Sequence, residues 1–377
     1  MKATLSVSHL VNKNVSGLGA YNAGLSVDEL KAKYQVDQVA KLGSNENPFP
    51  TSIAVTNILQ EDDNLGHYPD PYCKSLTKAL ADKLAVSAES IVVGNGSEDL
   101  IGIISRVFIE PGDKVMTVVP SFGLHILYPK ACGATVLIAE MTAQLKFDIE
   151  KIVTMLSVEK PKLFFIASPS NPVGCSLNQE DIKAILHHLS DDTLLVFDEA
   201  YYEYAKDDAD YPDVLSILKA SGKPFVLLRT FSKAYSLAGL RVGYGVFYPT
   251  ALADYSHKLR TPFNVNRMAQ KAAIVALNDD AHLSKTMAWN RLARDQMMSE
   301  LIALGLSPEV SKGNYLFFAT DWHGTELAKR LLRYGVIVKP WLEEGYQQYI
   351  RVSIGTEMEN QLFITSLREI LNASNEA

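Results

Sequence analysis

The sequence predicts an α/β protein. Its three-layer α/β/α large domain has a mainly parallel sheet of about seven strands, and a smaller α/β domain is attached. Two observations predict this fold. Short continuous apolar runs alternate with helical periodicity over the first two thirds of the chain, which is typical of parallel strands buried on both faces. After about residue 262 the pattern changes to long helical repeats, which predicts a connection to a second unit.

The composition is that of a globular protein and excludes several function classes. The 377 residues, 47% of them hydrophobic, allow two to three domains at about 150 residues each. The net charge of −7 argues against nucleic acid or an anionic membrane as a partner. Three widely spaced cysteines provide neither a disulfide framework nor a metal site. We therefore expect a cytoplasmic protein without a metal, a targeting segment or a membrane span, since no long apolar run occurs.

The first part of the chain is expected to be an arm followed by one helix and two loops. Residues 1–16 are polar and irregular, and Ser26 is placed to cap a helix that carries Leu30. Residues 43–50 and 67–71 are rich in proline, asparagine and aspartate, which predicts turns with fixed geometry.

Seven strands are expected after these loops, at residues 91–93, 115–119, 135–138, 163–167, 194–197, 225–228 and 242–247. Between the first strand and the next helix, the turn at Gly94 and Gly96 leaves backbone N–H groups free, where an anion can bind. A dinucleotide fingerprint would need glycine or alanine at Asp99, so dinucleotide binding is excluded there.

The last part of the chain predicts a helical spine and a second α/β unit. The spine runs to Gly305, and the unit contains a helix capped by Thr325 and a final helix over 357–371. Strands are expected at 315–318, 336–338 and 349–354. The expected domains are an arm (1–16), a large domain (45–262) and a small domain (17–44 and 263–377).

Polar residues follow three of the expected strands, and such residues meet in one crevice because the carboxyl ends of parallel strands lie together. Lys233 can form a Schiff base with an aldehyde if its amine is deprotonated. The hydroxyls of Thr230 and Ser232 and the guanidinium of Arg241 suit a phosphate. An aldehyde that carries a phosphate, as pyridoxal phosphate does, therefore fits this loop.

Other residues at strand ends supply what a pyridoxal phosphate ring needs. Asp198 can pair with the pyridine nitrogen, and Asn171 and Tyr201 can donate to the phenolic oxygen. Phe122 can lie on the ring face, and the backbone of Gly96, Ser97 and Glu98 can bind the phosphate.

The segments 168–174 (SPSNPVG), 198–201 (DEAY) and 232–241 resemble the signature of fold-type-I pyridoxal phosphate aminotransferases. Within this group, residues 20–24, 41–48, 67–70 and 351–356 resemble the histidinol-phosphate aminotransferase family, from about residue 17 to the C-terminus. The resemblance implies Lys233, Asp198 and Tyr201 as catalytic residues, with Lys233 as Schiff-base lysine and proton-transfer base. It implies a homodimer with shared active sites, in which Tyr68 reaches the cofactor phosphate of the neighbouring subunit. The substrate-binding residues that it implies are Tyr21, Asn45, Asn171, Lys339 and Arg351.

The resemblance implies a ping-pong reaction between an amine donor and an oxo acid. The favoured donor is histidinol phosphate, with 2-oxoglutarate as acceptor, a step of histidine biosynthesis. Three departures bear on the donor: Lys339 stands where arginine is common, His125 where tyrosine is usual, and Phe49-Pro50 where Leu-Gly is more common. If Lys339 is a second phosphate ligand, histidinol phosphate is favoured as the donor. If Lys339 only faces solvent, an aromatic amino acid is favoured as the donor instead. A pyridoxal phosphate decarboxylase or lyase resembling threonine-phosphate decarboxylase is the other alternative.

Overall fold

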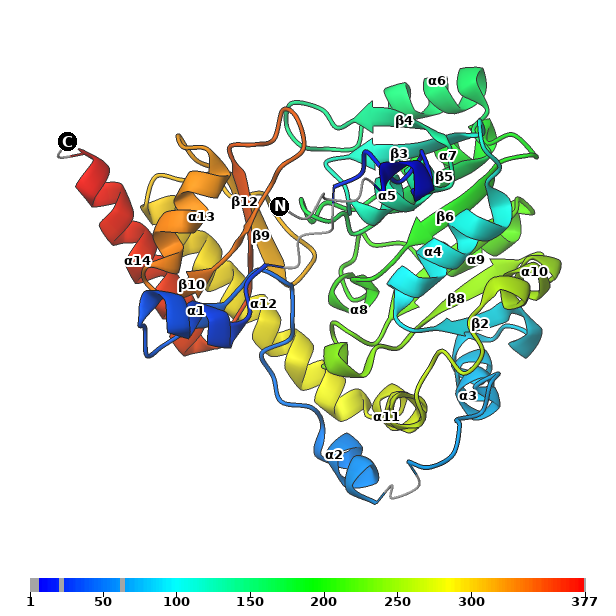
Figure 1. The fold of residues 1–377 in the computed structure, drawn as a ribbon, viewed down its shortest axis with the longest axis horizontal. Helices are drawn as coiled ribbons and strands as arrows, with labels where there is room; N and C mark the ends of the chain where they lie inside the picture. Colours follow the sequence, from blue (N-terminus) through cyan, green and yellow to red (C-terminus); the bar gives the residue numbers. More distant parts are fainter. Residues whose placement is uncertain (1–6, 20–23, 62–64, 376–377) are drawn as a thin grey trace, which may run out of the picture.

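The structure is a computed structural model that describes residues 7–19, 24–61 and 65–375. Figure 1 shows two layered units, a larger one around a broad sheet and a smaller one beside it, joined by the long helix α12. The larger sheet has seven strands in the order β2-β8-β7-β6-β5-β3-β4, all parallel except β8, which runs antiparallel to both neighbours. The expected fold class is therefore confirmed.

All seven expected strands of this sheet are present within a few residues of their predicted bounds. They are β2 (Ile91–Gly94), β3 (Lys114–Val119), β4 (Thr135–Glu140), β5 (Leu163–Ala167), β6 (Leu194–Asp198), β7 (Phe225–Thr230) and β8 (Gly243–Tyr248). Successive side chains enter opposite cores: Phe164 belongs to the core on one face of the sheet and Phe165 to that on the other. Such a strand reads as a continuous apolar run because both faces are covered.

Two layers of helices cover the sheet. One core includes side chains from α3 (Lys74–Leu84), α6 (Ile149–Glu159), α7 (Gln179–His188), α9 (Val214–Ser221) and α11 (Arg267–Leu277). The other core includes side chains from α4 (Ser97–Phe108), α5 (Leu124–Ala131) and α10 (Ala251–Leu259). The remaining elements outside the smaller unit are α2 (Ile53–Gln60), α8 (Tyr202–Ala205) and the 3-10 turns η1 (Ser8–Leu10), η2 (Ala88–Ser90) and η3 (Ala238–Leu240).

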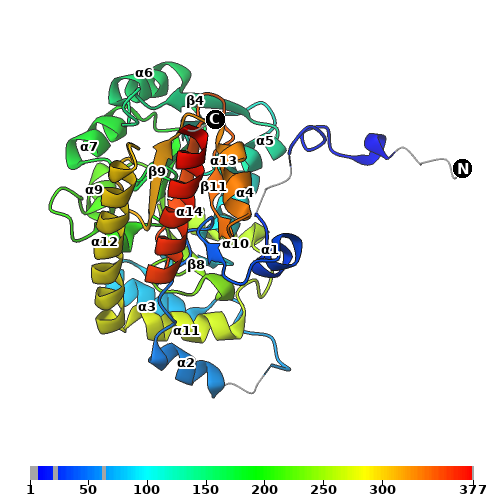
Figure 2. The ribbon, with the colours of Figure 1, turned by 90° about the vertical axis from the view of Figure 1, so that its left-hand side faces the viewer.

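The smaller unit has its own core. Strand β1 (Ala40–Lys41) pairs with β10 (Val336–Ile337), and β11 (Lys339–Pro340), β12 (Tyr349–Ser353) and β9 (Tyr315–Ala319) form an antiparallel sheet. Its helices are α1 (Val27–Tyr34), α12 (Asp280–Ala303), α13 (Gly324–Leu332) and α14 (Glu357–Asn375). Figure 2 shows α12 and α14 in front of these strands. Ala40 and Leu42 share this core with residues of α14. The division into domains made from the sequence stays a prediction.

Two details differ from the sequence expectations. The N-cap of α13 is His323, whose side chain accepts from the Thr325 N–H, so the prediction of Thr325 as the cap was wrong. The final helix continues to residue 375. Helices α2 and α3 lie in segments for which no prediction was made. Helix α2 buries only Val55, whereas α3 buries Leu76, Leu80 and Ala81.

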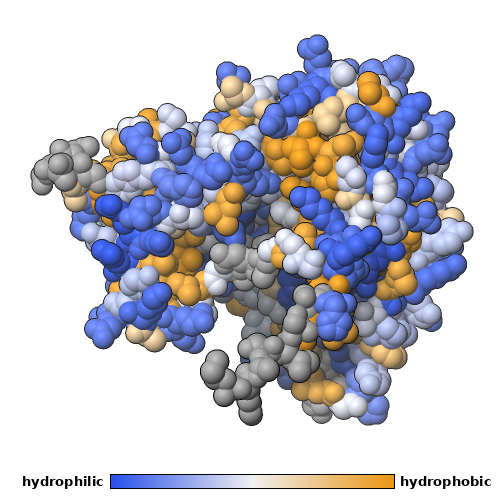
Figure 3. Space-filling model, turned by 45° about the horizontal axis from the view of Figure 1, so that its top comes forward, coloured by the Kyte–Doolittle hydropathy of each residue, from blue (hydrophilic) through white to orange (hydrophobic). Residues whose placement is uncertain are grey.

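The surface in Figure 3 is mostly hydrophilic, with one broad hydrophobic patch on the larger lobe. Among the described residues no helix is long and apolar enough to cross a membrane.

Candidate active site

A cavity of about 460 Å³ lies between the carboxyl ends of the large sheet and the strands of the smaller one. Thirteen of the residues singled out from the sequence line it: Gly96, Ser97, Glu98, Phe122, Asn171, Asp198, Tyr201, Thr230, Ser232, Lys233, Arg241, Lys339 and Arg351. Most of these residues lie at strand ends of the large sheet or at the start of α4, which the large sheet brings together at one edge. Lys339 and Arg351 come from β11 and β12 of the smaller sheet.

Lys233 lies in a loop whose first residues are held in place by their contacts. The Ser232 N–H donates to the Thr230 hydroxyl, and Phe231 is fully buried. The Lys233 amine donates to the Ser44 carbonyl oxygen at 2.9 Å. Burial, with Arg351 and Arg241 nearby, lowers the pKa of Lys233 from 10.5 to about 7, against the opposing effects of Glu46 and Asp198. An amine with this pKa is partly unprotonated near neutral pH and can act as a nucleophile or a base.

Asp198 ends β6 and is nearly buried, with 5% of its surface exposed. Its Oδ1 accepts from the Ala200 N–H at 3.0 Å. Its Oδ2 lies 3.3 Å from Nε2 of His125, although the two groups do not have hydrogen-bond geometry. The His125 ring stacks on Phe165 with a centroid distance of 5.2 Å. The histidine that departs from the family pattern therefore lies beside the buried carboxylate and does not line the cavity.

Asn45 lies behind the cavity wall. It is fully buried, its side-chain amide donates to the Tyr201 hydroxyl at 2.8 Å, and its Oδ1 accepts from the Ser353 hydroxyl at 2.9 Å. Its φ of 52° is in the left-handed region, which asparagine tolerates better than most residues. The structure thus places Asn45 where it orients Tyr201 and joins the two units.

A cradle for an anion forms where α4 begins. Gly96 has a φ of +85°, and a β-carbon there would lie 2.7 Å from Nη2 of Arg241. The same nitrogen is 3.5 Å from the Glu98 carboxylate. The N-terminus of α4, the Arg241 guanidinium and the hydroxyls of Thr230 and Ser232 all line the cavity. Helix N–H groups, a guanidinium and hydroxyls form a donor set that fits a phosphate group.

Two cations from neighbouring strands line the opposite part of the cavity. Lys339 in β11 is the direct cross-strand partner of Arg351 in β12, so their side chains share one face. Nη1 of Arg351 donates to the Asn171 amide oxygen at 2.6 Å and Nη2 to the Gly43 carbonyl at 2.7 Å. Its buried Nε has no hydrogen-bond partner among the described residues. Burial and Arg351 lower the pKa of Lys339. Lys339 therefore lines the cavity and does not only face solvent.

Besides Asn45, one other predicted residue of the described chain does not line this cavity. Tyr68 is 79% exposed and stacks on Phe263 with a centroid distance of 4.5 Å. Arg267 holds the backbone of this loop by donating to the carbonyls of His67 and Tyr68. Tyr21 lies outside the described residues.

Sequence reasoning did not predict the wall formed by Ser121, Trp341 and Glu343; it left Trp341 open between the core and the lining of a pocket. Oε2 of Glu343 accepts from the Trp341 indole N–H at 2.6 Å and from the Ser121 backbone N–H at 3.0 Å. Burial raises the pKa of Glu343, and these two hydrogen bonds oppose that rise. No motif marks these positions, because the contact joins two loops more than 200 residues apart.

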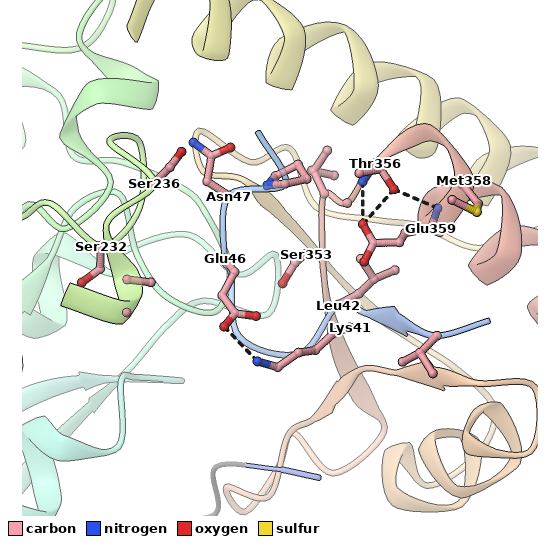
Figure 4. A pocket seen from close by; sticks show the side chains of 16 residues that line it. Lys41, Leu42, Glu46, Asn47, Ser232, Ser236, Ser353, Thr356, Met358 and Glu359 are labelled. Atoms are coloured by element: carbon pink, nitrogen blue, oxygen red, sulfur yellow. Dashed lines mark hydrogen bonds and ion pairs between the residues drawn. The ribbon is translucent and has the colours of Figure 1, made fainter. Parts of the chain in front are cut away.

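A second cavity, of about 610 Å³, lies behind the loop over residues 43–48 and is shown in Figure 4. Its polar lining includes the ion pair of Lys41 with Glu46 at 2.9 Å and the hydrogen bond from Thr356 to Glu359. It shares Ser232 with the first cavity but is lined by neither Lys233 nor Asp198. Although larger, it lacks the buried amine and carboxylate, so we take the first cavity as the candidate active site. The described residues contain no cluster of three His, Cys, Asp or Glu side chains that could hold a metal.

Comparisons with known proteins assign the chain to a family. The pattern of the family described as "Aminotransferase class I and II" matches residues 37–367. The chain is 42% identical over 364 residues to "Histidinol-phosphate aminotransferase 3" of Rhizobium meliloti (strain 1021), covering 96% of this chain and 98% of that protein. It is 36% identical over 352 residues to the histidinol-phosphate aminotransferase of Moorella thermoacetica, covering 93% and 90%.

Solved structures agree. The histidinol-phosphate aminotransferase of Sinorhizobium meliloti in complex with pyridoxal-5'-phosphate superposes with a TM-score of 0.87 at 26% identity, covering 96% of this chain and 98% of that chain. The aspartate aminotransferase of Thermotoga maritima shares the fold, with a TM-score of 0.82 at 23% identity, covering 96% and 100%. This chain therefore belongs to the class I and II aminotransferases.

Proposed function

We propose that this aminotransferase uses pyridoxal phosphate to move an amino group from L-histidinol phosphate to 2-oxoglutarate, as in histidine biosynthesis. The observation that carries the choice of donor is the cross-strand pair of Lys339 and Arg351 on the cavity wall. Two adjacent cations suit a phosphate monoester, which carries more than one negative charge, better than a single carboxylate. The names of relatives at 36% to 42% identity support the same donor.

The residues of the cavity fit the cofactor. When bound, pyridoxal phosphate supplies an aldehyde and a ring that withdraws electrons from the α-carbon of the donor. The cradle at α4, with Ser97, Ser232, Thr230 and Arg241, would hold its phosphate, as would the backbone of Gly96 and Glu98. Phe122 would lie on the ring, Asn171 and Tyr201 would donate to its phenolic oxygen, and Asp198 would keep its nitrogen protonated.

Lys233 would act as nucleophile and then as base. Its pKa of about 7 leaves a substantial fraction of the amine unprotonated at neutral pH. That amine would hold the cofactor by condensing with its aldehyde, with loss of water. Once the amine of the donor had displaced it, Lys233 would be free to take the proton from the α-carbon of the donor. Arg351 and Lys339 would bind the phosphate of the donor, with Arg351 already oriented by Asn171 and Gly43.

We also propose that the enzyme is a cytoplasmic homodimer in which Tyr68 reaches the cofactor phosphate of the neighbouring subunit. Tyr68 is 79% exposed and stacks on Phe263, which is also exposed. An exposed aromatic pair favours burial against a second chain. The three cysteines are all free, which fits a reducing compartment. Light scattering on the purified protein tests the dimer, and a monomer at micromolar concentration would refute it.

A half-reaction tests the function. The cofactor-loaded protein is mixed with L-histidinol phosphate without an oxo acid, and the visible absorbance is followed. We expect the absorbance of the aldehyde form to disappear and to return when 2-oxoglutarate is added. If phenylalanine or tyrosine causes this change and histidinol phosphate does not, the enzyme is an aromatic amino acid aminotransferase. Release of carbon dioxide without an oxo acid would instead indicate a decarboxylase.

A further inference from the structure

A buried ion pair lies behind the wall of the candidate active site. Glu199 directly follows β6 and Arg229 is the penultimate residue of β7; the two residues are 0% and 4% exposed. Their neighbours Asp198 and Thr230 line the cavity, whereas Glu199 and Arg229 do not. Successive side chains of a strand point to opposite faces, so the pair occupies the reverse side of the strands that present Asp198 and Thr230.

The pair is held in one geometry by several contacts. Nε and Nη2 of Arg229 lie 2.8 and 2.7 Å from Oε2 of Glu199. The Tyr211 hydroxyl lies 2.9 Å from Oε1 of Glu199 and 2.8 Å from the Ser168 carbonyl oxygen. The Arg229 guanidinium lies 3.5 Å from the centroid of the Tyr202 ring, within cation–π distance. Both carboxylate oxygens therefore have partners.

These contacts join the ends of three adjacent strands. Ser168 follows β5, Glu199 follows β6 and Arg229 is in β7, and these strands pair in that order. The backbone adds to the connection, since Ser168 N–H donates to the Asp198 carbonyl and Glu199 N–H to the Leu228 carbonyl. The cluster thus lies within one to four residues of Asn171, Asp198 and Lys233, three of the polar residues that line the cavity.

Stability alone does not account for a buried ion pair, because removing two charges from water is costly. Well-packed apolar side chains of similar volume are often equally stable or more so. A guanidinium that binds one carboxylate through two N–H groups does fix distance and orientation between two strands. Geometry of this kind matters in an active site, where a displacement of about 1 Å can lower the rate about 100-fold.

We propose that Glu199 and Arg229, with Tyr211, form a positioning unit that sets the placement of Asp198 relative to the Lys233 loop. The pair contacts neither substrate nor cofactor and acts through the strand ends. This inference rests on the proposed roles of Asp198 and Lys233 toward the cofactor, not on the identity of the donor.

The neighbouring residue Glu203 provides a matched control. It is also a buried carboxylate, 4% exposed, on the short helix α8 that follows the same strand. Its Oε2 has no hydrogen-bond partner among the described residues, so it does not join the strand ends in the same way. Glu203→Gln therefore changes a buried carboxylate without removing the proposed unit.

The test compares Glu199→Met/Arg229→Met, Arg229→Lys and Glu203→Gln with the native cofactor-loaded enzyme. For each we would measure the urea midpoint, the dissociation constant of pyridoxal phosphate, the pH at which the visible absorbance of the bound cofactor changes, and kcat and KM with L-histidinol phosphate. For the double variant we expect a native urea midpoint, at least a tenfold higher dissociation constant, a shifted absorbance titration and about a 100-fold lower kcat. The KM should change little, because Lys339 and Arg351 are untouched.

Arg229→Lys keeps the positive charge but loses the contact through two N–H groups, so it should show the same changes to a smaller degree. If the double variant does not fold, Arg229→Lys tests the proposal in its place. Glu203→Gln should behave like the native enzyme. The proposal would be overturned if a folded double variant kept the native cofactor affinity, absorbance titration and kcat. If the double variant does not fold, the same result in Arg229→Lys would overturn it. Equal losses in Glu203→Gln would also overturn it. If the native enzyme does not react with histidinol phosphate, the proposed function fails, while the cofactor affinity and the absorbance titration still decide this inference.

Discussion

The buried amine of Lys233 should destabilise the cofactor-free protein, and Lys233→Met should reveal this. The pKa of Lys233 falls from 10.5 to about 7, mainly through burial. Between these pH values the unfolded chain binds one proton that the folded chain does not. The free energy of unfolding therefore rises with pH from about 7 to about 10.5, and the full destabilisation is present below pH 7.

The size of the effect follows from the two pKa values. At about 1.36 kcal/mol per pKa unit, the fall from 10.5 to about 7 corresponds to at most about 5 kcal/mol. The methionine also removes the hydrogen bond to the Ser44 carbonyl, which costs about 1 kcal/mol. The variant should thus be more stable than the native cofactor-free protein by about 2–4 kcal/mol at pH 6, and the two should be nearly equal at pH 9.

Urea unfolding of the cofactor-free proteins at pH 6, 7.5 and 9 measures this difference. Lys130→Met, at an exposed position, is the control for replacing a lysine, and its difference from the native protein should stay constant with pH. A difference between the native protein and Lys233→Met that does not change from pH 6 to pH 9 would refute the pKa assignment and its electrostatic cause.

Three further predictions concern packing, orientation and the donor. Gly174→Ala should lower the free energy of unfolding by about 2–4 kcal/mol in urea titrations, because φ is +92° and a β-carbon would lie 2.8 Å from Cα of Ser311. Its control is Gly222→Ala, where φ is +67° and the space around a β-carbon is open. This variant should lower the free energy of unfolding by only about 1 kcal/mol. Asn45→Ala removes two buried side-chain hydrogen bonds and should cost about 2–4 kcal/mol, with a fall in kcat, whereas unchanged stability and kcat would contradict the orienting role. Lys339→Met should raise the KM for histidinol phosphate about 10- to 100-fold in steady-state assays, and an unchanged KM would exclude Lys339 as a phosphate ligand.

The strands and the polar residues at their ends could be predicted because their signals are local. A strand buried on both faces is a short apolar run, and β5 was predicted with its observed bounds, Leu163–Ala167. The parallel order then places Asp198 and Lys233 at the same edge, and both line the cavity. Their chemical roles stay predictions.

Other features could not be read from local patterns. The helix α13 begins two residues earlier than expected, and the Gly324 N–H donates to the Gln347 carbonyl, a contact made by a distant loop. Glu343 joins the cavity wall only because its loop meets Ser121 of the other unit. Asn45 resembles a substrate-binding residue by its motif, but the fold buries it behind Tyr201.

The sequence by itself determined the α/β class, the strands and the positions of Lys233, Asp198 and Arg241, because each depends on neighbours a few residues away. Only the tertiary structure decided the pKa of Lys233, the pairing of Lys339 with Arg351 and the ion pair behind Asp198. These properties depend on burial and on contacts between distant segments, such as Lys233 with Ser44, 189 residues away. A sequence pattern does not give the distances between segments that are far apart in the chain. The pKa shifts and ion pairs of the site could therefore be determined only from the tertiary structure.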